Sequence, residues 1–150
     1  MCLGNICRSP AAEGVFLNLM KRKGMEDRFI VDSAGTGGWH VGHKADERMR
    51  IAAQKRGIII ESLARKITLD DLINFDLILT MDNDNLLAVN SLVKDVNLKA
   101  SQKIRPILSY SRNNELTEVP DPYYGGDKGF EKVLDLLEDS CEGLIEDLIS

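Results

Sequence analysis

Short apolar runs alternate along this chain with longer segments whose apolar residues follow helical spacing. The clearest run is 76–81, which contains three consecutive apolar residues, and a second run covers 104–108. Runs of this length and type indicate buried strands, and Pro106 places the second one at a sheet edge. The clearest helical segment is 130–148, at the end of the chain. Strands that alternate with helices in this way are typical of an α/β fold with a mainly parallel sheet.

Capping residues mark the expected ends of the helices. We expect Ser9 as the N-cap and Pro10 in the first turn of the first helix, which ends at Gly24. Asp46 is expected to cap a second helix that stops at Gly57. The other expected elements are a short helix after the capping box of Thr68 and Asp71, helical segments at 83–92 and in part of 94–102, a short strand at 29–31, and a short strand or extended piece at 58–60.

Length and composition predict a single globular domain over residues 1–150, with 43% apolar residues. No apolar run approaches the roughly 20 residues of a membrane helix, and the first residues lack a signal-peptide pattern. An odd number of cysteines, three, without such a signal favours a reducing cytoplasm. Only two histidines and no Cys-x-x-Cys pair are present. We therefore expect no structural zinc. No cofactor is expected either.

The net charge of −5 argues against a nucleic-acid partner. The charge is unevenly distributed, because residues 1–66 are net basic and residues 67–150 are net acidic. A basic N-terminal half suits an anionic ligand on an acidic protein. Ordinary variation of the surface is the alternative explanation.

The segment 2–9 carries the chemistry that points to a function. Gly4 and Asn5 accept backbone conformations closed to most residues, so the loop can turn its N–H groups inward at the start of a helix. Such a nest at a helix N-terminus binds anions, and Arg8 can clamp phosphate oxygens through two N–H groups. The same positive field favours the thiolate form of Cys2 without a histidine base. A thiolate inside a phosphate nest is a nucleophile aimed at phosphorus.

This segment resembles the phosphate loop of the low-molecular-weight protein tyrosine phosphatases. Near the other end of the chain, Asp121-Pro122-Tyr123-Tyr124 is similar to the general-acid loop of that family. Further similar segments occur in order at Ser33-Ala34-Gly35-Thr36, Trp39, Ala64-Arg65 and Phe75-Asp76 through Met81-Asp82. The resemblance covers nearly the whole chain. It implies a three-layer sandwich, in which a mainly parallel four-stranded sheet has helices on both faces.

The resemblance also implies a reaction, the hydrolysis of phosphotyrosine or other aryl phosphate monoesters through a phosphocysteine intermediate. Cys2 would attack phosphorus, Arg8 would hold the phosphoryl oxygens, and Asp121 would protonate the leaving oxygen. The expected partners are phosphotyrosine proteins or small aryl phosphates, with phosphate, sulfate or vanadate as ligands. No metal is required, since Arg8 and the loop dipoles supply the positive charge.

The resemblance assigns further residues around this reaction. Asn5 and Ser9 would support the loop, and Ser9 would also stabilise the Cys2 thiolate. The residues expected to bind phosphate are Leu3, Gly4, Asn5, Ile6, Cys7 and Arg8, and those expected to line the substrate cleft are Ile6, Trp39, Tyr123 and Tyr124.

Several of these residues have a plainer alternative. Cys7 is either a redox partner that forms a reversible disulfide with Cys2 or a small buried residue under the loop. Trp39 and the tyrosines either wall the cleft or serve as packing and loop anchors. Cys141 lies on the apolar stripe of the last helix and is expected in the core. The histidines, His40 and His43, are expected as solvated loop residues.

Three other functions are possible for a chain with this loop: arsenate reduction, phosphoarginine hydrolysis, and phosphate binding without turnover. Thioredoxin-coupled arsenate reductases share the loop but use two further cysteines in mid-chain, and residues 60–100 contain none. Protein arginine phosphatases tend to carry threonine where Ile6 stands, and the apolar Ile6 suits an aromatic ring better than a guanidinium group. The third possibility is a truncated, inactive chain that binds phosphate without turnover.

Two positions depart from the family pattern. Many members carry a histidine where Ser62 stands, and that histidine supports the loop asparagine. The family also has a central first strand before the phosphate loop, for which only Met1 remains here. We expect that the 150 residues omit this strand; the alternatives are that another segment takes its place or that the loop is poorly ordered.

Overall fold

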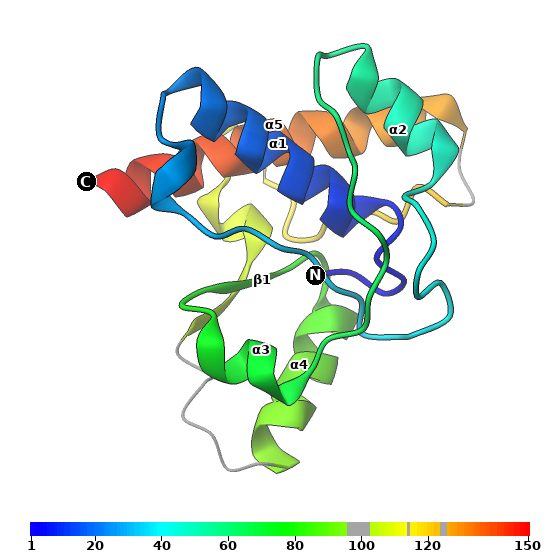
Figure 1. The fold of residues 1–150 in the computed structure, drawn as a ribbon, viewed down its shortest axis with the longest axis vertical. Helices are drawn as coiled ribbons and strands as arrows, with labels where there is room; N and C mark the ends of the chain where they lie inside the picture. The colour runs from blue at the N-terminus through cyan, green and yellow to red at the C-terminus, as the bar shows by residue number, and fades with distance from the viewer. Residues whose placement is uncertain (96–102, 114, 124–125) are drawn as a thin grey trace.

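The computed structural model describes residues 1–95, 103–113, 115–123 and 126–150 (Figure 1). Its elements are α1 (Arg8–Arg22), η1 (Glu26–Arg28), α2 (Glu47–Gln54), α3 (Leu69–Asn74), β1 (Ile78–Thr80), α4 (Asn83–Asp95), β2 (Ile104–Pro106), η3 (Ile107–Tyr110) and α5 (Asp127–Ile149). Helix α4 includes the predicted segment 83–92, whereas most of the segment 94–102 lies outside the described residues. Within the described ranges, no helix is both long enough and apolar enough to cross a membrane.

The helices lie on both sides of the central strands. Helices α1, α2 and α5 cover one side and α3 and α4 the other (Figure 1). Each side has its own apolar cluster, with Val15, Met49 and Leu137 on the first and Leu72 and Val89 on the second. This layering follows from amphipathic helices that each bury one face against the strands. It confirms the predicted α/β class and three-layer sandwich.

The longest helix, α5, packs along α1 and buries the apolar stripe that its sequence predicted. Cys141 is only 1% exposed and belongs to this cluster, so its predicted core position is confirmed. Leu148, at the end of the stripe, is 42% exposed because it lies in the last turn, beyond the residues that α5 buries.

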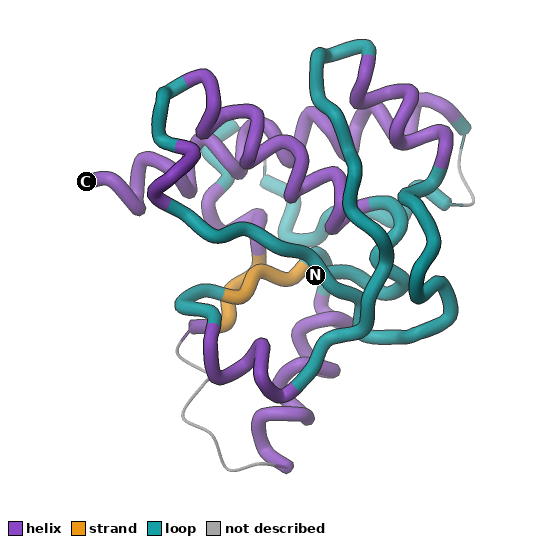
Figure 2. The backbone as a smooth tube through the Cα atoms, viewed as in Figure 1, coloured by secondary structure: helices purple, strands orange, loops and turns teal. Residues whose placement is uncertain are grey.

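The central strands are short. Strand β1 pairs in parallel with β2, with Ile78 opposite Ile104 and Thr80 opposite Pro106 (Figure 2). In the part of the chain that the structure describes, these two strands form the regular sheet, in place of the four strands expected. The parallel pairing continues beyond β1 only as single-residue bridges, from Cys2 to Gly35 and from Gly35 to Lys66.

Met1 and Cys2 lie between β1 and the segment 34–36 and bond to both. The Met1 amino group donates to the Leu79 carbonyl at 2.7 Å, and the Met81 N–H donates to the Met1 carbonyl at 3.2 Å. On the other side, the Thr36 N–H donates to the Cys2 carbonyl at 2.9 Å. Burial lowers the pKa of the Met1 amino group to about 6. These bonds set Cys2 at the carboxyl edge of the strands, immediately before α1.

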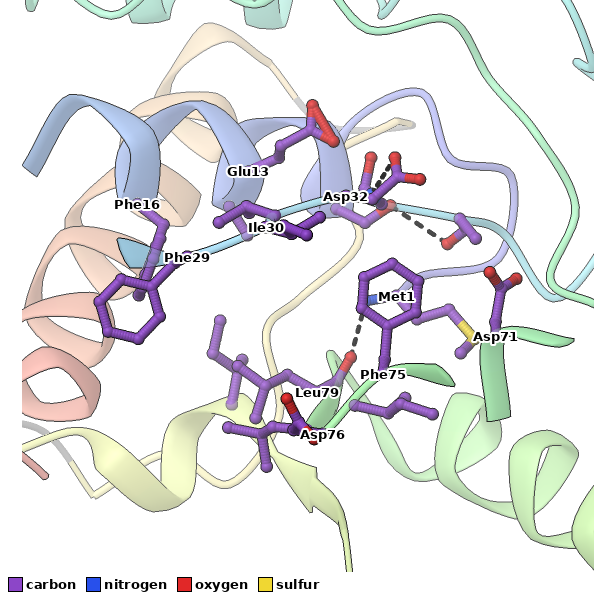
Figure 3. A pocket seen from close by; sticks show the side chains of 18 of the residues that line it. Met1, Glu13, Phe16, Phe29, Ile30, Asp32, Asp71, Phe75, Asp76 and Leu79 are labelled. Atoms are coloured by element: carbon purple, nitrogen blue, oxygen red, sulfur yellow. Dashed lines mark hydrogen bonds between the residues drawn. The ribbon is translucent and has the colours of Figure 1, made fainter. Parts of the chain in front are cut away.

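A cavity of about 580 Å³ adjoins this ladder. Figure 3 shows Ile30 and Asp32 on one side of it and Phe75 and Leu79 on the other, with Met1 between them. Of the predicted site residues that the structure describes, Ser9 alone lines this cavity. Apart from Ser9, this cavity is therefore separate from the cysteine–arginine loop.

Two local expectations are corrected. Residues 29–31 are extended but form no regular strand, because no ladder hydrogen bond to them is present among the described residues. The N-cap of α1 is Cys7, not Ser9, and Ser9 with Pro10 falls in the first turn. The Ser9 hydroxyl contacts Cys2 and Asn5 instead of the helix N–H groups, which explains the shift.

Candidate active site

The loop 2–9 is held in shape by Asn5. Its φ of 57° is left-handed, a conformation that asparagine tolerates better than most residues. The side chain is 2% exposed; its Nδ2 donates to the Ser9 and Ser33 hydroxyls at 2.8 and 3.0 Å, and its Oδ1 accepts from the Arg65 N–H at 3.0 Å. A buried amide with these partners has little freedom to turn.

Asn5 is held without the histidine that many family members carry at the position of Ser62. The family histidine expected at that position would support Asn5. Here Ser33 and Ser9 occupy both donor directions of the amide, so the support comes from other residues. Among the described residues, Asn5 is thus held by Ser9, Ser33 and the Arg65 N–H and not by Ser62.

Cys2 is buried at the base of the loop and shares a hydrogen bond with Ser9. The Cys2 Sγ and Ser9 Oγ atoms are 3.0 Å apart. Because Ser9 also accepts from Asn5, its hydroxyl proton is free to point at the sulfur or at the Ala34 carbonyl, which is 3.5 Å away. The Ser9 hydroxyl therefore links the Cys2 sulfur to Asn5.

Backbone N–H groups are available around the loop. Over the described part of the chain, no hydrogen bond to another protein group is donated by a backbone N–H of residues 3–8. These groups lie at the start of α1, where the helix dipole adds a partial positive charge. The arrangement suits a bound oxyanion.

Arg8 points its guanidinium toward the same loop, although it is only 3% exposed. Its Nη1 donates to Asp82 Oδ2 at 2.6 Å and to the Val119 carbonyl at 3.0 Å. Because Nη1 donates both of these hydrogen bonds, the remaining N–H groups of the guanidinium can donate to another acceptor. Its Nη2 lies 3.8 Å from Asp121 Oδ2.

Asp121 therefore lies beside Arg8, although the two are far apart in the sequence. Its side chain is 44% exposed, so its carboxyl group is accessible from solvent. Its Oδ1 accepts the Tyr123 N–H at 3.0 Å, which orients the carboxyl group within its own turn.

A cavity of about 210 Å³ brings most of the predicted residues together. Its lining residues are Cys2, Leu3, Gly4, Ile6, Cys7, Arg8, Trp39, His40, Asp121 and Tyr123. Trp39 and Tyr123 stand on its rim, since they are 71% and 39% exposed. Asn5 and Ser9 lie behind the loop, where support residues belong, and Tyr124 falls outside the described residues.

The thiols other than Cys2 are held neutral. Burial, with a further contribution from the Asp46 carboxylate, raises the pKa of Cys7 to about 12. Burial likewise raises the pKa of Cys141 to about 12. Within the described ranges, no cluster of three or more histidine, cysteine, aspartate or glutamate side chains could hold a metal ion.

Three positions that shape the site were not predicted from the sequence. His40, expected to be solvated, lies against Gly4 and lines the cavity. Asp82 pairs with Arg8; the sequence placed it after a buried strand, in a segment similar to the family, but gave it no role. Gly35 packs so closely that an added Cβ would lie 2.8 Å from the Leu3 carbonyl oxygen and 3.1 Å from the Asn5 nitrogen.

Comparison with known proteins shows which family the chain belongs to. The family model for low molecular weight phosphotyrosine protein phosphatases matches residues 1–150. The chain belongs to this family. The enzyme class predicted from the sequence is thereby confirmed, because relatives named protein-tyrosine phosphatases match over nearly the whole chain.

Individual relatives agree with this family. The low molecular weight protein-tyrosine-phosphatase YfkJ of Bacillus subtilis is 40% identical, over 97% of this chain and 90% of its own length. A protein tyrosine phosphatase of Entamoeba histolytica, solved with Hepes in its active site, is 45% identical with a TM-score of 0.92 and covers 99% and 93% of the two chains. A Drosophila arginine phosphatase is 32% identical with a TM-score of 0.93, covering 99% and 95%.

Proposed function

We propose that this phosphatase hydrolyses aryl phosphate monoesters, phosphotyrosine above all, through a phosphocysteine on Cys2. The observation that carries the proposal is the convergence of Cys2, Arg8 and Asp121 on one cavity at the N-terminus of α1. The cavity holds a candidate nucleophile, a guanidinium and a carboxyl group, and it is lined by an apolar side chain, Ile6. We further propose that residues 1–150 act as one catalytic domain.

In the first step, the Cys2 sulfur forms a bond to phosphorus while the bond from phosphorus to the phenolic oxygen breaks. Asp121 gives its proton to that oxygen, so the phenol leaves neutral. Arg8 and the backbone N–H groups of the loop donate hydrogen bonds to the phosphoryl oxygens and stabilise their negative charge.

In the second step, water attacks the phosphocysteine. Its oxygen bonds to phosphorus as the sulfur–phosphorus bond breaks, and the Asp121 carboxylate takes the proton released by the water. Inorganic phosphate leaves and the Cys2 thiolate is restored. The exposure of Asp121 supports this double role, because its carboxyl group can meet both a leaving group and water.

Hydrolysis of p-nitrophenyl phosphate by the 150-residue chain tests the proposal. Cys2→Ser should abolish turnover. Asp121→Ala should lower kcat/KM by roughly 10²–10⁴-fold for phenyl phosphate, whose leaving group needs the proton, and by less for p-nitrophenyl phosphate. Asp70→Ala, which removes an exposed carboxylate on α3, is the matched control and should retain activity. An inactive parent chain that still binds vanadate would instead identify a phosphate-binding protein, and activity in Cys2→Ser would overturn the mechanism.

Phosphoarginine is the second candidate substrate, because the similar Drosophila protein is an arginine phosphatase. Ile6 favours the aryl substrate, since an apolar side chain at the cavity gives a guanidinium group no hydrogen-bond partner. Comparing kcat/KM for phosphotyrosine and phosphoarginine peptides separates the two. A higher value for phosphoarginine would overturn the assignment to phosphotyrosine.

Cys7 is proposed as a redox partner of Cys2. Both thiols are free and line the same cavity, which supports a disulfide between them. Because burial raises the pKa of Cys7, we propose that a peroxide oxidises Cys2 first, with cleavage of its O–O bond, to the sulfenic acid. Cys7 then forms the S–S bond as the S–O bond breaks, and its proton leaves with the hydroxide as water. Three free thiols are consistent with a cytoplasmic protein, which is where we place the enzyme.

A further inference from the structure

Two residues at the N-terminus of α2 connect the phosphate loop with the loop that carries Asp121. The first connection is made by the backbone of Asp46, whose N–H donates to the Ile6 carbonyl at 2.7 Å. Ile6 belongs to the loop that surrounds the cavity. The start of α2 is therefore bonded directly to the proposed phosphate site.

The second connection is the ion pair between Asp46 and Arg48. The Asp46 carboxylate caps α2 by accepting the Arg48 N–H at 2.8 Å. It also accepts Nε and Nη2 of the Arg48 guanidinium at 3.1 and 3.0 Å, so the two groups meet as a fork. Burial alone would raise the pKa of Asp46, but these bonds lower it below its usual value. The carboxylate is thus held in place and charged.

From this anchor, Arg48 reaches the other loop. Its Nη2 donates to the Tyr123 carbonyl at 3.2 Å. Its guanidinium carbon lies 5.5 Å from the centre of the Tyr123 ring and 4.7 Å from that of Phe130, a buried residue of α5. Planar contacts on two rings restrict where a guanidinium can lie.

The last contact leads to the carboxyl group. The Tyr123 N–H donates to Asp121 Oδ1 at 3.0 Å, and Asp121 Oδ2 lies 3.8 Å from Arg8. A continuous series of contacts thus runs from Ile6 through Asp46, Arg48 and Tyr123 to Asp121. Arg48 is not among the residues that line the cavity, so it acts without touching a substrate there.

We propose that Asp46 and Arg48 form a bracket that positions Asp121 over the phosphate loop, with Arg48 as a positioning residue for proton transfer. This inference rests on the proposed function of Asp121 as general acid. The alternative is that the pair is an ordinary surface salt bridge that only caps α2, and such a pair has little effect on a distant group.

If Arg48 positions Asp121, the loss of activity in an Arg48 variant should depend on the leaving group of the substrate. Poor leaving groups such as phenol need the proton from Asp121, whereas p-nitrophenolate leaves readily without it. Arg48→Gln should lower kcat/KM for phenyl phosphate, which reports on formation of the phosphocysteine, by about 10- to 100-fold, because small misplacements of a reacting group have effects of this size. The loss for p-nitrophenyl phosphate should be several times smaller, and the inhibition constant of vanadate should not change.

Arg48→Lys and Arg50→Lys supply the controls. Lysine at 48 keeps the charge but cannot bond Asp46 and the Tyr123 carbonyl as a fork, so it should show the same selective defect in weaker form. Arg50, on the same helix, bonds to the Ala45 carbonyl at 2.9 Å and is no part of the bracket. Arg50→Lys should keep the parent dependence on the leaving group.

A double-mutant cycle distinguishes positioning from general destabilisation. In an Asp121→Ala background, Arg48→Gln should cause almost no further loss of kcat/KM, because the group that it positions is gone. Full additivity of the two losses, or equal losses for both substrates, would overturn the bracket. An inactive parent chain would overturn the proposed function instead, so the two failures are distinguishable.

Discussion

At the scale of single residues, the site depends on contrasts between similar side chains. Cys2 and Cys7 both line the cavity and are equally buried at 3% exposure. They differ in their neighbours: Cys2 has the Ser9 hydroxyl, whereas Cys7 faces the Asp46 carboxylate, which with burial raises the pKa of Cys7 to about 12. Chemical reactivity should therefore separate the two thiols.

We expect iodoacetamide at neutral pH to modify Cys2 and to spare Cys7 and Cys141. A thiol whose pKa is about 12 is almost entirely protonated at pH 7, and the protonated form is a poor nucleophile. Peptide mapping by mass spectrometry measures the labelling of each cysteine, and inorganic phosphate should slow the labelling of Cys2. Labelling of Cys7 as fast as that of Cys2 would contradict this view.

Gly35 is the second residue whose identity matters to the site. A methyl group there would press on the backbone of the phosphate loop, so Gly35→Ala should displace the loop. We expect kcat/KM to fall by roughly 10²-fold, the size of effect that a small misplacement produces. In Gly38→Ala, the added carbon meets only side-chain atoms at 3.6 and 3.7 Å, and activity should persist. Equal activity in both variants would refute the steric account.

At the scale of elements, capping and pairing connect α3 to the site. The predicted capping box is confirmed, with Asp71 accepting the Thr68 N–H. Asp71 also accepts both terminal nitrogens of Arg65 at 2.8 and 3.0 Å, and the Arg65 N–H holds Asn5. The capping box was visible in the sequence because its residues are neighbours; the link to Asn5 was not, because it depends on how α3 packs.

The Asp71 interactions predict a pH dependence of stability. Burial would raise the pKa of Asp71, but the bonds from Arg65 and Thr68 lower it below its ordinary value of 3.8. A lowered folded-state pKa stabilises the protein above 3.8, and this stability is lost as the pH falls through the folded value.

Thermal melting of the parent and of Asp71→Asn from pH 7 to pH 3 checks this expectation. The parent should have the higher Tm at pH 7, and the difference should shrink as the pH falls below about 4. The exposed Asp70→Asn should melt like the parent throughout. A difference in Tm that is the same at both ends of the pH range would exclude the linkage.

At the scale of the whole molecule, two apolar clusters flank a sheet whose regular part is short. The ladder that Met1 and Cys2 form with β1 and the segment 34–36 borders the cavity of about 580 Å³. An engineered extension of alternating valine and isoleucine before Met1 should continue this ladder into the cavity. Full burial of a side chain contributes about 1.5–3 kcal/mol and ordering a residue costs roughly 1–2 kcal/mol, so we expect a net gain where the added side chains are fully buried.

We expect this extension to raise Tm by several degrees. A glycine–serine extension of the same length is the control, because it adds no apolar surface. Differential scanning calorimetry compares the three chains. If both extensions leave Tm unchanged, the cavity does not accept a strand.

Most helices, the phosphate-loop motif and the turn with Asp121 could be predicted from neighbouring residues, because periodicity, caps and short motifs are local properties. The structure of residues 29–31 and the N-cap of α1 could not, because they depend on contacts with other segments. The same holds for the bond of Asp82 to Arg8, the bond of Asn5 to Ser33, and the places of Gly35 and Arg48 beside the two loops. These partners come from segments far apart in the chain, and their meeting depends on how the elements pack, which no local pattern encodes.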